Sequence, residues 1–155
     1  PWELVVGKIL PYVAIGYVQM TLILLVGRVA FRVPFVGSPL LLYALAFLFI
    51  GANLALGLFF STLARTQQQA MMTALFLVML PLIYFSGFVF PIESMPRVVQ
   101  PLTEADPLKQ LLLVLRGVML RGAGLAELWP AVLKLAAIGV VTFAGAAALF
   151  QKRLA

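Results

Sequence analysis

Four long stretches of this sequence carry no charged side chain: Ile9–Gly27, Val33–Ala64, Thr66–Ile92 and Leu135–Gln151. An α-helix rises about 1.5 Å per residue, so about 20 apolar residues cross the roughly 30 Å hydrocarbon core of a bilayer. The stretches therefore predict four membrane-spanning helices, near residues 8–31, 39–63, 68–90 and 129–150. Lys134 falls inside the fourth helix, close enough to its start for the ammonium to reach the headgroup region.

The composition excludes most soluble classes of protein. Hydrophobic residues make up 64% of the chain and charged residues 10%, whereas soluble domains have about 45–50% and about 25%. A soluble enzyme, a disordered tail and a nucleic-acid-binding domain all fit poorly, because the 11 Lys and Arg are scattered singly and form no basic stripe. We expect an all-α, polytopic membrane helical bundle that contacts membrane lipids and no nucleic acid.

The longest link between the predicted spans covers residues 91–128. It contains Leu108–Leu120, an apolar stretch of 13 residues, which is too short to cross a bilayer. Gly122-Ala123-Gly124 follows and is typical of a helix end. We expect an interfacial or re-entrant helix in this link, before the last span.

The sequence offers no basis for catalysis. It contains neither cysteine nor histidine, and its five acidic residues are dispersed. Gly7-Lys8 lacks the upstream glycine of a phosphate-binding loop. We therefore predict no catalytic residue, no metal ligand and no cofactor bound by this chain, and any ATP hydrolysis must occur on another polypeptide.

Several polar side chains fall inside the predicted spans. Tyr12, Gly16 and Gln19 share one helical face with Lys8, and Asn53 lies midway along the second span. This pattern fits residues that line a transport path. It fits equally a packing role, with Tyr12 at the headgroup level and the two amides bonded to neighbouring helices.

The third predicted span contains Pro81, which removes one helical hydrogen bond and should kink the segment. Ser86-Gly87 and Pro91 follow it. A simple packing kink and a hinge near the outer mouth of a transport path are both compatible with this arrangement.

Four segments of the chain, taken in order, carry a family resemblance. They are residues 1–12, residues 61–71 with Arg65, Thr66, Gln67, Gln68 and Gln69, residues 86–96 with Gly87, Pro91 and Met95-Pro96, and Arg116-Gly117 followed by 122–125. Together with the basic end 151–154, they resemble the permease subunits of type 2 ABC (ATP-binding cassette) exporters. At Lys109-Gln110 the sequence departs from the family's pattern.

The resemblance implies an arrangement and a mechanism. The chain would be a single transmembrane domain, 1–155, that corresponds to the last four of six helices, with both ends cytoplasmic. A separate ATPase, which binds ATP and Mg, would dock near Pro1–Lys8 and Arg65–Gln69, and two permease copies would form a dimer. The assembly would move a hydrophobic or amphiphilic compound outward across a bacterial inner membrane, along Tyr12, Gly16, Gln19 and Asn53. The outer motif would contain Pro81, Gly87, Pro91, Arg116 and Gly117.

Two observations keep alternatives open. Counting Lys and Arg gives four on the side of the termini and six on the other side, which favours the opposite orientation. A non-conducting scaffold or assembly subunit would share the same composition. Part of an ion-coupled secondary transporter is a third interpretation, although such proteins usually carry an acidic residue within a span, and these spans contain none.

Overall fold

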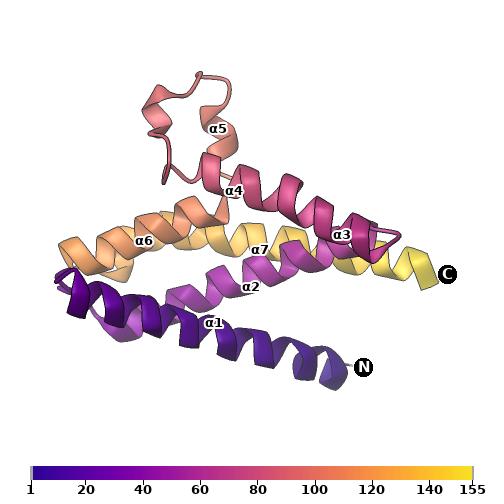
Figure 1. Ribbon diagram of the computed structural model, residues 1–155, viewed down its shortest axis with the longest axis horizontal. Coiled ribbons are helices and arrows are strands. Elements are labelled where there is room, and N and C mark those ends of the chain that lie inside the picture. Colours follow the sequence, from indigo (N-terminus) through magenta and orange to yellow (C-terminus); the bar gives the residue numbers. More distant parts are fainter. Residues whose placement is uncertain (1, 155) are drawn as a thin grey trace.

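The computed structural model describes residues 2–154, and all regular structure in this part of the chain is helical (Figure 1). In chain order the elements are α1 (Trp2–Ala30), α2 (Pro39–Leu63), α3 (Gln67–Thr73), the π-helix η1 (Ala74–Met79), α4 (Leu80–Phe85), the 3-10 helix η2 (Ile92–Ser94), α5 (Gln100–Thr103), α6 (Pro107–Arg121) and α7 (Leu125–Leu154). Pro1, and the side chains of Trp2, Val5, Arg153 and Leu154 in the terminal motifs, lie outside the described part.

Four segments are long and apolar enough to cross a membrane: Val6–Ala30, Pro39–Leu63, Gln67–Phe85 and Leu125–Lys152. The predicted all-α membrane bundle is therefore confirmed. Four boundaries differ from the prediction by four residues or more, because α1 begins at Trp2, α4 ends at Phe85, and α7 extends from Leu125 to Leu154.

The early end of the third span has a local cause. The hydroxyl of Ser86 donates to the carbonyl of Ile83 at 2.8 Å and accepts from the N–H of Phe88 at 3.2 Å. Gly87 then adopts φ 78°, a left-handed conformation that suits glycine. These bonds replace the helical ones, so the long link starts at residue 86 rather than 91.

Helix α2 lies at the centre of the structure and packs most extensively against α7. Small residues allow the close approach: Ala52 and Ala55 of α2 and Ala146 of α7 are buried. A Cβ added to Gly139 would lie 3.6 Å from Ala52. Such contacts are typical of helix packing in membranes, where backbones come close enough for extensive van der Waals contact.

Helix α6 lies against α2 and runs antiparallel to the first half of α7 (Figure 1). Leu42, Val114 and Val118 have no exposed surface and form the core between these helices. The helix ends as predicted, because Gly122 takes φ 64° and its N–H bonds to the carbonyl of Gly117. Of the three helices in the link, η2, α5 and α6, it is α6 that packs most extensively against the last span.

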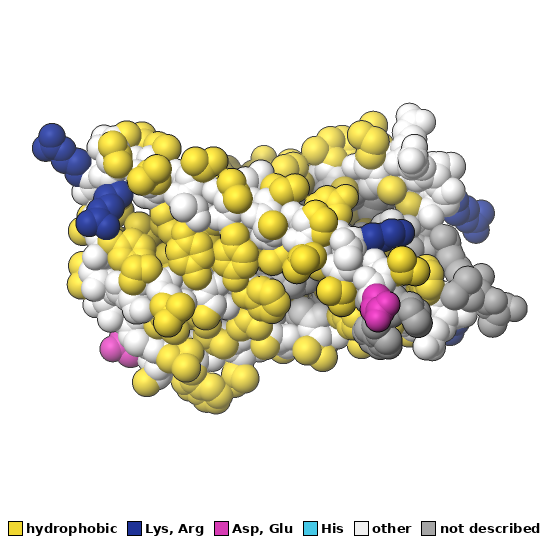
Figure 2. All heavy atoms as spheres, turned by 90° about the horizontal axis from the view of Figure 1, so that it is seen from below, with side chains coloured by type: hydrophobic (Ala, Val, Ile, Leu, Met, Phe, Trp, Pro, Cys, Tyr) yellow, Lys and Arg dark blue, Asp and Glu magenta, His cyan; other side chains and the backbone are white. Residues whose placement is uncertain are grey.

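The outer surface is mostly apolar. No residue of the most apolar window of Val6–Ala30 or of Gln67–Phe85 is buried within the chain. Figure 2 shows hydrophobic side chains over the middle of one face and Lys and Arg toward the two ends of the long axis. A surface of this kind is stable against lipid or against other membrane helices.

Candidate functional site: an apolar groove with a charged end

A groove follows α2 where the segment Gln67–Phe85 lies beside it. It consists of two open cavities of about 180 Å³ and about 320 Å³, which share Phe60 and Val78. Residues that line the smaller cavity are Leu56, Phe60, Leu77, Val78, Pro81, Leu82, Phe85, Leu102, Ala105, Asp106 and Pro107. The larger cavity is lined by Asn53, Gly57, Phe60, Ser61, Ala70, Met71, Ala74 and Val78. Almost the whole lining is therefore apolar.

One wall of this groove has an irregular backbone. Residues 74–79 form a π-helix, in which the N–H of Leu80 bonds to the carbonyl of Leu75. Pro81 follows and has no N–H to donate, so the carbonyl of Leu77 lacks its ordinary helical partner. Pro81, predicted from sequence to kink this helix, thus lies in the wall of the smaller cavity. Single π-turns are rare and frequently occur at functional sites.

Asp106 is the ionisable residue of the smaller cavity. It caps the start of α6, where Oδ1 accepts from the N–H of Leu108 at 2.9 Å. Only 6% of the residue is exposed, and Oδ2 is buried without a hydrogen-bond partner. Burial raises the pKa of Asp106 to about 6, although the backbone N–H groups of Leu108 and Lys109 and the charge of Lys109 act in the opposite direction.

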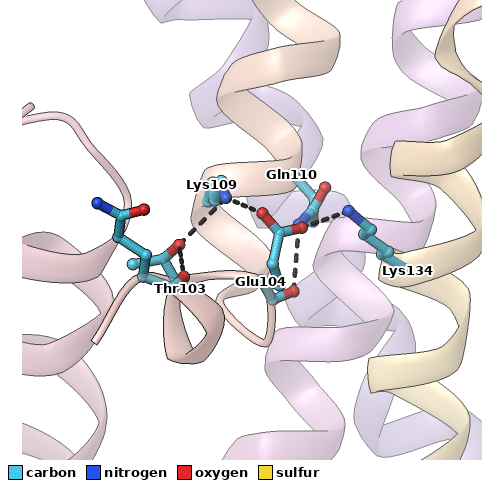
Figure 3. Close-up of polar contacts among 6 residues, drawn as sticks. Thr103, Glu104, Lys109, Gln110 and Lys134 are labelled. Atoms are coloured by element: carbon cyan, nitrogen blue, oxygen red, sulfur yellow. Dashed lines mark hydrogen bonds and ion pairs between the residues drawn. The ribbon is translucent and has the colours of Figure 1, made fainter. Parts of the chain in front are cut away.

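Next to Asp106, the carboxylate of Glu104 bridges two lysines (Figure 3). One oxygen accepts from Lys109 of α6, and the other accepts from Lys134 of α7. These hydrogen bonds lower the pKa of Glu104. Lys134 therefore finds a counter-ion in the link, and this pair joins α7 to the segment that precedes α6.

The two residues that depart from the family's pattern belong to this polar cluster. Lys109 also donates to Thr103 Oγ1 at 3.1 Å, and Gln110 Nε2 donates to the carbonyl of Glu104 at 3.2 Å. Both side chains are buried, Gln110 completely. The signal for this cluster in the sequence is indirect. Lysines within apolar segments need a partner, but Glu104 lies thirty residues before Lys134.

Of the predicted path residues, only Asn53 lines the groove. It faces the larger cavity, and its amide nitrogen donates to the carbonyl of Phe49 at 3.0 Å. Gly16 of α1 faces α2 instead, where a Cβ would lie 3.1 Å from Ile50 Cδ1. Tyr12 and Gln19 are exposed on α1. The structure thus does not bring the four residues together within this chain.

A tyrosine pair joins α1 to α2 and was not singled out from the sequence. The hydroxyl of Tyr17 donates to the carbonyl of Tyr43 at 2.9 Å, and the two rings stack with centroids 5.7 Å apart. Thr21 Oγ1 and Tyr43 OH share a hydrogen bond of 2.6 Å. The available signal was the spacing of Tyr17 and Thr21, which places both on one helical face.

The predicted ATPase-side loop is a capped turn with exposed side chains. Thr66 Oγ1 accepts from the N–H of Gln69 at 3.1 Å, and Gln69 Oε1 accepts from the N–H of Arg65 at 3.0 Å. This reciprocal pattern resembles a capping box and fixes the start of α3. Gln67 and Gln68 remain exposed with Arg65, so the turn offers a polar surface to a partner.

The remaining motif residues are spread over the link. Gly87 and Pro91 lie in the connection after α4 and precede η2. Arg116 is exposed on α6, whereas Gly117 is buried, and a Cβ at Gly117 would lie 2.8 Å from Leu128 Cδ2. Gly117 therefore allows α6 and α7 to pack closely.

The four long apolar helices agree with comparisons of the sequence. Residues 1–120 match the family model described as ABC-2 type transporter. The chain belongs to the ABC-2 type transporter family.

Curated ABC-2 relatives cover most of the chain. It is 32% identical over 153 residues to the probable multidrug ABC transporter permease YbhR of Escherichia coli (strain K12), which covers 99% of this chain and 41% of YbhR. It is 38% identical over 120 residues to YbhS of the same strain, with the same description, covering 77% of this chain and 32% of YbhS. It is 34% identical over 157 residues to the E. coli inner membrane transport permease YhhJ, covering 99% of this chain and 41% of YhhJ. The chain thus spans about two fifths or less of these permeases, and no solved structure matches it significantly.

Proposed function

We propose that the chain forms the groove-bearing part of a permease subunit in an ATP-driven exporter of hydrophobic or amphiphilic compounds. The match of residues 1–120 to the ABC-2 type transporter model carries this proposal. In it, a separate cassette subunit binds ATP and Mg, two permease copies form a dimer, and both ends of this chain face the cytoplasm. The four spans and the E. coli relatives support an integral protein of the inner membrane.

The groove supports the substrate class. Its lining is apolar apart from a few side chains, and it is open rather than enclosed. An apolar compound dissolved in the bilayer can enter such a groove without first crossing water. The π-helix beside Pro81 supplies a wall whose hydrogen bonds are already irregular, as expected where a helix changes shape.

Reconstitution tests the proposal. The full-length permease and its cassette partner, placed together in proteoliposomes, should move a fluorescent amphiphile only with ATP and Mg. A partner variant that lacks the Walker lysine should abolish transport. Transport driven by a proton or sodium gradient without nucleotide would favour a secondary transporter, and no transport of any compound would favour a scaffold.

Cysteine labelling tests the orientation, since the chain has no cysteine of its own. Val98 in the link is 85% exposed, and Gln68 is exposed in the turn before α3. An impermeant maleimide applied to intact cells should label Val98→Cys and should miss Gln68→Cys until the membrane is opened. The reverse pattern would mean that the count of positive charges predicts the orientation correctly.

A further inference from the structure

The end of the bundle opposite the two termini carries an arginine on each of three neighbouring segments (Figure 1). Arg28 lies in the last turn of α1, Arg32 in the connection 31–38, and Arg121 in the last turn of α6. Figure 2 shows basic side chains that project from this end of the long axis. We call these three residues the arginine end.

Backbone contacts hold the three segments together. The connection folds back on α1, because the N–H of Val33 donates to the carbonyl of Gly27 at 3.1 Å. It also bonds to the end of α6, where the N–H of Val36 donates to the carbonyl of Met119 at 3.0 Å. The arginines therefore extend from one ordered surface.

The positive charge of this surface has no counter-ion within the described part of the chain. Arg28, Arg32 and Arg121 are exposed, and the ion pairs between described residues involve only Glu104 and its two lysines. Glu127, in the first turn of α7, is also exposed and unpaired among these residues. Four arginines, if Arg116 further along α6 is included, thus face one carboxylate. An anion from outside the chain would complement this excess.

The neighbouring apolar side chains indicate that this anion belongs to a lipid. Phe31, next to Arg32, is 77% exposed, and Leu120, next to Arg121, and Trp129 of α7 are also exposed. Tryptophan is enriched where the hydrocarbon meets the headgroups. A soluble anion would leave these apolar side chains in water, whereas a phospholipid offers a phosphate to the arginines and acyl chains to their neighbours.

The residue type and the backbone of Arg32 support the same ligand. The planar guanidinium of arginine binds a phosphate through two parallel hydrogen bonds, which lysine cannot form. Arg32 also has a φ of 53°, a left-handed conformation that is uncommon for a residue other than glycine, asparagine or aspartate. Strained backbone of this kind clusters at ligand-binding sites.

We propose that the arginine end binds the phosphate groups of anionic phospholipids. Arg28, Arg32 and Arg121 hold the headgroups, while Phe31 and Trp129 contact the upper part of the acyl chains. This inference goes beyond the proposed function, because it requires neither ATP nor a transported compound.

Local fluorescence quenching in bilayers tests the proposal. Leu120 is exposed beside Arg121, and this chain has no cysteine, so Leu120→Cys in a cysteine-free full-length permease can carry a fluorophore at the arginine end. The probes are phosphatidylglycerol and phosphatidylcholine with brominated acyl chains, which quench the fluorophore only when they lie close to it. Quenching should show a preference for phosphatidylglycerol over phosphatidylcholine of about tenfold or more.

Arg32→Asn should lower this preference about fivefold, the effect of one basic residue near an anionic membrane surface. Asparagine tolerates a left-handed backbone, so this variant should melt no lower than the wild type. Arg97→Asn is the matched control, because Arg97 is an exposed arginine of the link and also has no ion pair within the described residues. It should keep the preference of the wild type.

Three results would overturn the proposal. One is a preference in Arg32→Asn within twofold of the wild type, and another is an equal loss in Arg97→Asn. The third is loss of the preference when glycerol phosphate is added at millimolar concentration, which would mean that the arginine end binds soluble phosphates. A preference that survives glycerol phosphate would identify the membrane lipid as the ligand.

Discussion

The connection between α1 and α2 meets the end of α6 at Gly37, and replacing this glycine tests the packing there. A Cβ on Gly37 would lie 2.3 Å from the carbonyl oxygen of Val118 and 2.8 Å from its Cγ1. The neighbouring N–H of Val36 donates to the carbonyl of Met119 at 3.0 Å. Gly37→Ala must move the connection away, which loses a bond worth about 0.5–1.5 kcal/mol and adds an overpacking cost of about 1–3 kcal/mol. We expect a destabilisation of roughly 2–4 kcal/mol.

Gly27→Ala on α1 is the matched control, because nothing lies within 4 Å of a Cβ there. Alanine is favoured over glycine inside a helix by about 1 kcal/mol, so the two changes should have opposite signs. Both changes in stability can be measured by heating the purified full-length permease and monitoring the folded fraction by size-exclusion chromatography. A drop of about 5–15 °C is expected for Gly37→Ala, at about 2–4 °C per kcal/mol. If both variants melt within about 2 °C of the wild type, Gly37 does not pack against α6 as described.

Two further changes test the charged cluster and the groove. Glu104→Gln leaves the buried Lys109 without its counter-ion and should lower the free energy of unfolding by about 1–3 kcal/mol. Thermal melts should show a smaller loss when Lys134→Gln is added to this variant than when it is made alone, because both changes break one network. The pKa of Glu104 is lowered in the folded state. The stabilisation by Glu104 is therefore present above its ordinary pKa of 4.5 and is lost as the pH falls through its pKa in the folded state. The Gln variant should not show this loss. In proteoliposomes, Asn53→Leu should reduce transport more than Gln19→Leu, because Asn53 lines the groove and Gln19 does not; equal effects would contradict the assignment of the groove.

The spans were predictable because lipid penalises charge over a fixed thickness, so the charge-free stretches mark them directly. The end of α6 was predictable for a local reason, since a glycine such as Gly122 readily takes the left-handed conformation that ends a helix. The end of α4 was not, because the hydroxyl of Ser86 competes with the helix through bonds that sequence periodicity does not reveal. The π-helix before Pro81 was not predictable either, because sequence periodicity does not reveal a change from α-helical to π-helical hydrogen bonds.

The candidate site was harder to predict than the spans. Asn53 was found because an amide inside a span is conspicuous, but the groove that it lines depends on how α2 packs against α3 and η1. In the sequence, nothing distinguishes Glu104 and Asp106 from the other charged residues of the link. Their roles depend on burial and on contacts with Lys109 and Lys134, which arise only when the link folds back onto α7.

The close packing of α2 against α7 has a consequence for how the protein is made. Ala52 and Gly139, which contact each other in the folded structure, are synthesised several seconds apart at a translation rate of about 5–20 residues per second. During this interval α7 is not yet available to cover the small-residue face of α2. Ribosome release before α7 is complete would leave a product that exposes this face to the bilayer and to membrane proteases. The arrival of α7 is therefore the step that covers the small-residue face of α2.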